Sequence, residues 1–454
     1  MWYTYDVKKL RLKLFFAVLV FAALCVVGRL ALPWRVEVKL RAIRAAGYPV
    51  TLAELDRWYL KVSTETNSAE LYGAAFAKLA GRDGPVPLAL DELTNGLPQG
   101  TPLPSEVKQS INALLASNSG VLDLLHKAAE LKRSRYPLNL TRLSLRPYSH
   151  LGYLGESAHL LEAEALQYAD DQDSTSAVRS VTSLLGLARS LATEPLMRSH
   201  LARIECQQIA AATLEQVLNR TVPADADLRH LTTALNEADD PQTLTRAFVG
   251  QRCIGIYSFD MMTPAANPSL LPVKRSLPLW QKLVIYPVLF IRFPSLMYYP
   301  SGLMHWDELQ YLQFMDHYVA AAKMPFPERI AAAQSLQRAV ARMPGFDVLS
   351  RQWLRNMNGP DIILKDVANT ARLRAARTAV AVERYRLTHG QLPTTLAALV
   401  PSCLDAVPAD PFDSASAPLQ YRKLAKGYVV YSIGSDVAND SGDKKKDVTF
   451  TVER

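Results

Sequence analysis

Residues 174–192 read STSAVRSVTSLLGLARSLA, and this stretch indicates the fold class of most of the chain. Its apolar side chains recur every three or four residues, so one face of an α-helix carries them. They are Val178, Val181, Leu184, Leu185, Ala188 and Leu191. An acidic turn at residues 170–173 precedes this helix and Pro195 follows it. We therefore expect separate helices over residues 151–169 and 198–219.

The same helical pattern extends from Thr51 to about residue 345. Thr51 and Glu54 have the spacing of a capping box, in which the two side chains bond free backbone N–H groups at a helix start. Alanine-rich helix pairs with short polar turns resemble helical repeat arrays, but no fixed repeat length is present. The predicted body, residues 35–355, is therefore either an irregular helical bundle or a solenoid-like array.

Composition and charge exclude several classes of protein. Of the 454 residues, 49% are hydrophobic and 21% charged, which excludes a mainly disordered chain. The net charge is +8, and the first 44 residues hold nine basic but only two acidic side chains. The remainder is nearly neutral and lacks the basic surface that nucleic acid requires. We therefore predict no nucleic-acid partner.

The sequence LFFAVLVFAALCVVG at residues 14–28 is long, apolar and uncharged. Together with residues 29–34 it reaches the roughly 20 residues that cross a bilayer as a helix. We predict an uncleaved transmembrane anchor over residues 14–34, with a cleaved secretory signal and a lipidated Cys25 as alternatives. Four cations in residues 1–13 favour a cytoplasmic N-terminus. The expected location is the bacterial inner membrane, crossed once, with the main body in the periplasm.

A second apolar stretch, LVIYPVLFIRFPSLMYY, covers residues 283–299. It is short for a membrane span and contains two prolines and an arginine. We consider three interpretations: a buried core segment, contact with the membrane surface, or a second span. For membrane contact the candidate residues are Leu283, Phe290, Arg292 and Phe293.

The last hundred residues follow a different pattern. A helix is predicted from Pro360 to His389, and Gly390 ends it in the left-handed conformation that glycine favours. Alternating apolar runs then predict strands near residues 419–422, 428–432 and 448–452, the first two joined by a short turn. We predict a small α+β domain over residues 356–454, with the helix packed on an antiparallel sheet.

This succession resembles the globular domain of type II secretion major pseudopilins. The matching segments are Glu383-Arg-Tyr385, His389-Gly-Gln-Leu-Pro393, Asp410-Pro-Phe412, Tyr421, Tyr431-Ser-Ile-Gly-Ser-Asp436 and Asp447-Val448. The resemblance implies the pseudopilin fold and a calcium loop whose matched carboxylates are Asp436 and Asp447. Asp440 and Asp443 lie between them and complete the candidate set, because calcium takes six to eight oxygen ligands. An ordinary solvated turn is the alternative, and Lys444, Lys445 and Lys446 favour it.

The chain departs from pseudopilins at its N-terminus, where the family's processing motif is absent from the membrane segment. We therefore expect no pilin-like processing or polymerisation.

Catalytic motifs are weak throughout. Gly155-Glu-Ser157-Ala-His159 matches half of a nucleophile elbow but opens a helix, so we interpret Ser157 as a cap or surface residue. His305 and Glu308 share one helical face, but no second ligand pair accompanies them. The four cysteines are scattered, and we expect buried free thiols more than a bridge between Cys206 and Cys253.

These observations predict a membrane-anchored envelope protein with a helical scaffold and a pseudopilin-like interaction module, linked to a secretion-type assembly. The expected partners are membrane lipid and other envelope proteins, and calcium is the expected cofactor. A membrane-anchored hydrolase with its site near residues 283–317, or a lipid-binding envelope protein, is the alternative.

Overall fold

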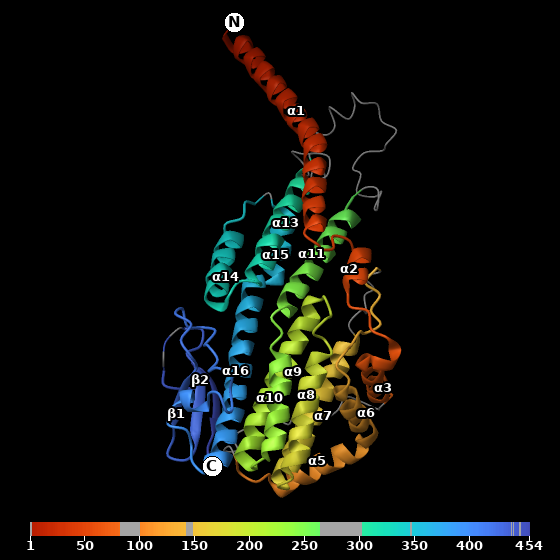
Figure 1. The fold of residues 1–454 in the computed structure, drawn as a ribbon. Coiled ribbons are helices and arrows are strands. Elements are labelled where there is room, and N and C mark those ends of the chain that lie inside the picture. The colour runs from red at the N-terminus through yellow and green to blue at the C-terminus, as the bar shows by residue number, and fades with distance from the viewer. Residues whose placement is uncertain are drawn as a thin grey trace. The chain divides into compact units, whose positions relative to one another are not determined.

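A computed structural model gives the chain a mainly helical fold with one small antiparallel sheet near the C-terminus (Figure 1). It describes residues 2–81, 100–141, 149–263, 302–345, 347–436, 438, 440–444 and 446–454, although many side chains among residues 2–29 are not described. The predicted mainly α class with a small C-terminal sheet is confirmed.

The larger elements before the C-terminal sheet are α1 (Trp2–Ala45), α2 (Leu52–Trp58), α3 (Ser68–Ala80), α5 (Ser105–Ser117), α6 (Ser119–Glu130), α7 (Ser149–Asp170), α8 (Ser174–Arg189), α9 (Met197–Arg220), α10 (Asp225–Ala238), α11 (Thr243–Met261), α13 (Leu303–Ala321), α14 (Phe326–Ala341), α15 (Val348–Met357) and α16 (Gly359–His389). The strands are β1 (Gln420–Lys423), β2 (Tyr428–Ser432) and β3 (Val448–Val452), and two 3₁₀ helices are η1 (Thr64–Thr66) and η4 (Leu396–Leu399).

Two compact units make up the chain. The smaller unit comprises Met1–Trp58, Val249–Val319 and Ser335–Gly359, and the larger comprises Tyr59–Phe248, Ala320–Gln334 and Pro360–Arg454. The last boundary falls close to the change of pattern at residue 356. The residues after it nevertheless share one compact unit with most of the helical body.

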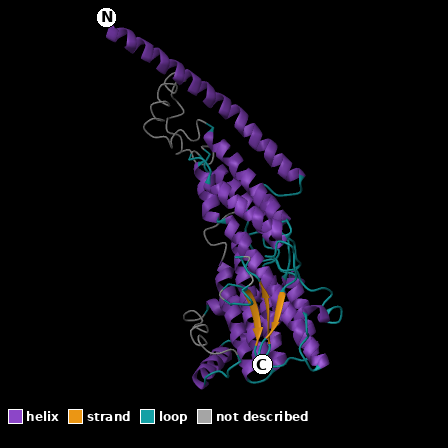
Figure 2. Cartoon of the chain, turned by 90° about the vertical axis from the view of Figure 1, so that its left-hand side faces the viewer, coloured by secondary structure: helices purple, strands orange, loops and turns teal. Residues whose placement is uncertain are grey.

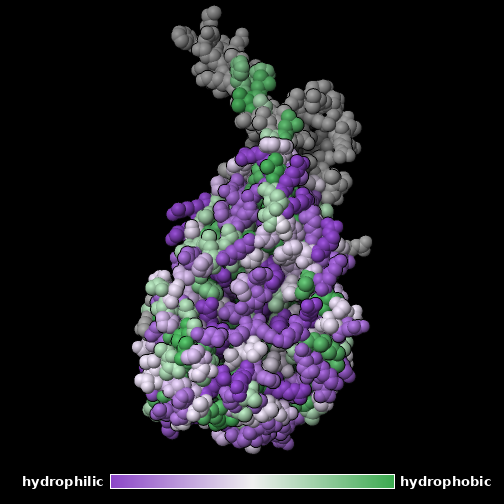
Figure 3. Space-filling view, viewed as in Figure 1, coloured by the Kyte–Doolittle hydropathy of each residue, from purple (hydrophilic) through white to green (hydrophobic). Residues whose placement is uncertain are grey.

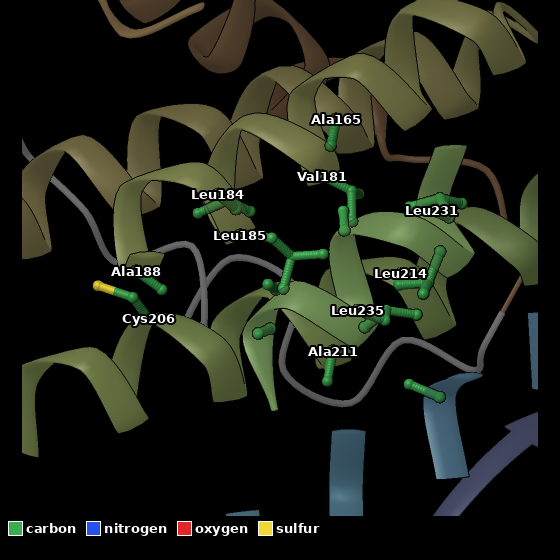
Figure 4. Packing of buried hydrophobic residues seen from close by; sticks show 14 of the residues in the cluster. Ala165, Val181, Leu184, Leu185, Ala188, Cys206, Ala211, Leu214, Leu231 and Leu235 are labelled. Atoms are coloured by element: carbon green, nitrogen blue, oxygen red, sulfur yellow. The ribbon is translucent and has the colours of Figure 1, made fainter. Parts of the chain in front are cut away.

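Helix α8 is the central helix of the larger unit and packs against α6, α7, α9 and α10. Its side chains Val181, Leu184 and Leu185 are almost completely buried among those of the neighbouring helices (Figure 4). At Gly186 a Cβ atom would lie only 2.7 Å from the Cβ of Ala129 in α6, so glycine permits the close approach of these two helices. The three helices predicted around residues 174–192 are confirmed as α7, α8 and α9.

The sheet packs on α16 and shares its core with the helical body (Figure 2). Its order is β1-β2-β3, with both neighbouring pairs antiparallel. Gly427 has φ +84° in the turn of the β1–β2 hairpin, a conformation that favours glycine. Every residue of β2 is buried, and the Tyr428 hydroxyl donates to the Ala379 carbonyl oxygen of α16 at 3.1 Å. The predicted helix and three strands are confirmed.

Side chains of α9 form hydrogen bonds with the backbone groups at the outer edge of β3. Asn219 donates through Nδ2 to the Thr451 carbonyl oxygen at 2.8 Å and accepts from the Glu453 amide at 2.7 Å. The Glu215 carboxylate accepts from the Thr451 amide at 3.1 Å. An exposed strand edge is a template for pairing with another chain, so α9 blocks β3 from such pairing.

The smaller unit has a core of its own, formed where the end of α1 meets α11 and α13 through Val36, Ile43, Ile256 and Leu312. The predicted capping of α2 is confirmed, since the Glu54 amide donates to Thr51 Oγ1 at 3.1 Å. The Glu54 carboxylate reaches back to the Val50 amide at 2.8 Å. Counting only described residues, the structure contains no helix that combines the length and hydropathy needed to cross a bilayer.

Candidate functional site

The candidate metal loop runs from Asp436 to Asp447 and connects β2 to β3. Its start is fixed by Asp410, a buried residue of the Asp-Pro-Phe segment. Asp410 accepts from the Ser432 hydroxyl at 2.6 Å and from the Ile433 amide at 2.9 Å. Gly434 has φ +71°, and a Cβ there would lie 2.3 Å from the Lys446 carbonyl oxygen. The glycine therefore lets the two ends of the loop meet.

Within the loop, the carboxylates bond mainly to the loop itself. Asp447 accepts from the amides of Gly442 and Asp443 at 2.8 and 3.2 Å, and Asp436 accepts from the amide of residue 438 at 3.1 Å. Asp440 pairs with the Lys446 ammonium group at 3.0 Å, and this hydrogen bond raises the pKa of Lys446. The loop thus carries a cation of its own beside Asp440.

The fit of these residues to calcium is partial. In favour, Asp440 Oδ2 and Asp447 Oδ1 are buried and accept no hydrogen bond from any described residue. Against it, the described residues contain no cluster of three or more His, Cys, Asp or Glu side chains arranged to hold a metal ion. The Lys446 ammonium group also lies where it repels a divalent ion. The calcium site stays a prediction.

The four residues predicted for membrane contact, Leu283, Phe290, Arg292 and Phe293, lie outside the described residues. Further along the chain, His305 and Glu308 share a face of α13, with 3.4 Å between His305 Nδ1 and Glu308 Oε2. Asp260 of α11 lies near this pair, and burial together with the Glu308 charge raises the pKa of Asp260.

The interpretation of Ser157 as a cap or surface residue is wrong. Ser157 is fully buried inside α7, and its hydroxyl donates to the Tyr153 carbonyl oxygen at 2.8 Å. A hydroxyl that bonds the carbonyl four residues earlier can enter a helical core without an unsatisfied donor. The cysteine prediction holds, because Cys206 and Cys253 are both buried free thiols.

A Ser–His–Glu arrangement, absent from the sequence prediction, lies between α6, α7 and α8. His126 is 2.8 Å from the Ser183 hydroxyl through Nδ1 and 2.8 Å from Glu164 through Nε2. Glu164 also accepts from the Ser180 hydroxyl at 2.6 Å. The distances are those of a hydrolytic triad. All four side chains are nearly inaccessible to solvent, so a substrate cannot reach them, and the group serves as a buried hydrogen-bond network.

A second buried network surrounds Asp366 of α16. Arg329 donates to one carboxylate oxygen at 3.0 Å, and His200 Nε2 lies 3.3 Å from the other. Burial raises the pKa of Asp366, but His200, Arg329 and Arg203 together outweigh it and hold this pKa below its usual range. No sequence spacing indicates this cluster, because its members come from α9, α14 and α16.

Comparison of the chain with protein-family models, with curated proteins and with solved structures finds no match. Its own residues therefore have to carry the functional assignment.

Proposed function

We propose that the chain is a membrane-anchored envelope protein that holds a pseudopilin-like interaction module on a helical scaffold. Residues 14–34 cross the bacterial inner membrane once, residues 1–13 lie in the cytoplasm, and the main body lies in the periplasm. The proposal includes contact of the module with other envelope proteins of a secretion-type assembly.

The observation that carries this proposal is the exposure of large apolar side chains along α1 (Figure 3). Between 48% and 74% of each of these side chains is exposed: Phe15, Phe16, Leu19, Val20, Leu30 and Trp34. Several large apolar side chains exposed on one helix mark an interaction or membrane site in a folded protein. A bilayer buries it and leaves the basic residues on either side in contact with headgroups.

The packing of the larger unit supports a scaffold role. Helix α8 packs against α6 and α10 as well as its sequence neighbours α7 and α9, so the helices of this unit share one continuous core. The C-terminal module shares the core of this bundle, and α9 covers the edge of β3. The scaffold would therefore present the module rigidly, with its remaining surface available to a partner.

Calcium binding by the loop from Asp436 to Asp447 is part of the same proposal. The buried oxygens of Asp440 and Asp447 that accept no hydrogen bond support it. When bound, calcium would coordinate these carboxylate oxygens and displace the Lys446 ammonium group from Asp440.

Alkaline carbonate extraction of bacterial membranes tests the anchor. The full chain should stay in the membrane pellet. A double variant with Leu19→Arg and Val20→Arg should leave it, since each arginine at a helix centre costs about 2.5–3.5 kcal/mol of insertion free energy. The matched control places two arginines at Asn112 and Ala113, which are exposed on α5. Release of the unaltered chain by carbonate would contradict the proposal, as would equal retention of both double variants.

A further inference from the structure

A groove of about 630 Å³ lies in the larger unit, between α10, α16 and residues 401–409. Its volume is within the range of roughly 300–1,000 Å³ that is common for binding pockets. Three arginines of α16 line it, Arg374, Arg377 and Arg384, and Asp239 and Asp405 line it as well. Spacings of three and seven residues place all three arginines on one face of the helix.

Two of these arginines have structural tasks. Arg384 pairs with Asp225 of α10 at 2.9 Å. Arg374 donates to the Ala409 carbonyl oxygen at 2.8 Å and lies 3.6 Å from Asp239. These contacts hold residues 401–409 and α10 against α16, so they build the walls of the groove.

Arg377 differs from both. Its Nη1 donates to the neutral amide oxygen of Asn236 at 2.6 Å. Its Nε is buried and finds no hydrogen-bond acceptor among the described residues, and none of their carboxylates forms an ion pair with it. Burial lowers the pKa of Arg377, and the nearby charge of Asp239 only partly offsets this effect. The groove therefore holds a partly desolvated guanidinium group whose Nε donor is unused, a state that an incoming anion would stabilise.

We propose that this groove binds a carboxylate-bearing segment of a protein partner, and that Arg377 receives the carboxylate. The inference rests on the proposed interaction role of the C-terminal module and names the chemistry of its partner. A guanidinium group offers parallel donors that match one carboxylate. Asp239 and Asp405 would repel a dianionic phosphate more strongly than a single carboxylate. Exposed residues border the groove at positions 402, 405 and 406, so an extended chain can enter and leave it.

Cys403 lines the groove and provides the readout. It is half-buried, whereas Cys206 and Cys253 are fully buried, and burial raises the pKa of Cys253 to about 12. The full chain is purified in mild detergent and treated with the uncharged thiol reagent N-ethylmaleimide. Peptide mass spectrometry then measures the rate at which Cys403 is alkylated. The probes are the capped pentapeptide Ala-Glu-Ala-Glu-Ala, its glutamine counterpart, and inorganic phosphate. We expect saturating glutamate peptide to slow alkylation about tenfold, and the glutamine peptide and phosphate to leave the rate unchanged.

Variants assign the effect to Arg377. Arg377→Gln should raise the concentration of glutamate peptide needed for half-maximal protection about ten- to a hundredfold, the range expected for charge-assisted hydrogen bonds. Asn236→Asp keeps the arginine and places a competing carboxylate beside it. The two side chains have the same shape and residue 236 is exposed, so the chain should stay folded while the affinity for the glutamate peptide falls by a similar factor. Arg372→Gln is the matched control, because Arg372 is a partly buried arginine of the same helix that lies near Glu215 and outside the groove.

Equal protection by the glutamate and glutamine peptides would overturn the proposal. Full protection in both Arg377→Gln and Asn236→Asp would overturn it too. Protection by phosphate equal to that by the glutamate peptide would replace the protein segment with a free oxyanion and so reject the partner named here. None of these outcomes depends on whether α1 spans a membrane, so failure of the groove and failure of the anchor are separable.

Discussion

Replacing Asn219 by alanine should loosen the C-terminal strand from the helical body. Asn219 is buried on α9, where it donates to the Thr451 carbonyl oxygen and accepts from the Glu453 amide. These two bonds occupy backbone groups at the outer edge of β3. Alanine removes both the donor and the acceptor of Asn219, and its short side chain cannot form either bond.

The expected cost follows from the burial of each group. Thr451 is buried, so its orphaned carbonyl costs about 1–3 kcal/mol, whereas Glu453 is exposed and its amide can bond water at a cost of about 0.5–1.5 kcal/mol. Alanine is the better helix former and returns about 0.5 kcal/mol. The free energy of unfolding should fall by about 1–4 kcal/mol, which for a unit of this size lowers Tm by about 2–6 °C.

Thermal unfolding measures the loss, and hydrogen exchange with mass spectrometry on residues 448–454 shows where it occurs. Exchange in this segment should accelerate more than in α8. Asn112→Ala is the control, because Asn112 is an exposed helical asparagine and its replacement should change stability by less than about 0.5 kcal/mol. A similarly small effect of Asn219→Ala, with unchanged exchange in β3, would refute the argument that α9 completes the sheet.

Three further perturbations test other parts of the fold. Asp366→Asn leaves the surrounding buried cations unbalanced and should cost about 3–5 kcal/mol at pH 7. The pKa of Asp366 is lowered in the folded state, so its carboxylate contributes fully to the free energy of unfolding above about pH 4. This contribution is lost as pH falls through the folded pKa. The free energies of unfolding of the two chains, measured by denaturant titration, should therefore converge below about pH 4. Leu185→Ala should cost about 2–5 kcal/mol in the same assay, and a loss under 1 kcal/mol would show that α8 is not central. Calcium at ten times its dissociation constant should raise the free energy of unfolding by about 1.4 kcal/mol. Chelator or Asp440→Asn should abolish this rise. An unchanged free energy of unfolding at every millimolar calcium concentration would contradict calcium binding.

The helices and strands were predictable because their signals are local. The apolar period of residues 174–192 is complete within α8, and Gly390, with φ +69°, ends α16 where its sequence indicates. The capping of α2 by Thr51 depends on four consecutive residues. Each of these patterns depends only on the geometry of one helix.

The candidate site was only partly predictable. The position of the loop between β2 and β3 followed from the order of strands, but the pairing of Asp440 with Lys446 did not. The prediction for Ser157 failed for a related reason. A polar residue in a helix is commonly exposed, whereas the Ser157 hydroxyl bonds the backbone of its own helix and fits the core.

The sequence alone determined which segments are helix, which are strand, and that a long apolar stretch near the N-terminus stands apart from the neutral body. Only the tertiary structure decided which side chains meet: Asn219 with the edge of β3, Asp366 with His200 and Arg329, and Arg377 with a neutral asparagine. The reason is physical. Secondary structure depends on the spacing of residues within a few turns, whereas a buried contact depends on how distant elements pack, and a single sequence holds no periodic signal for that.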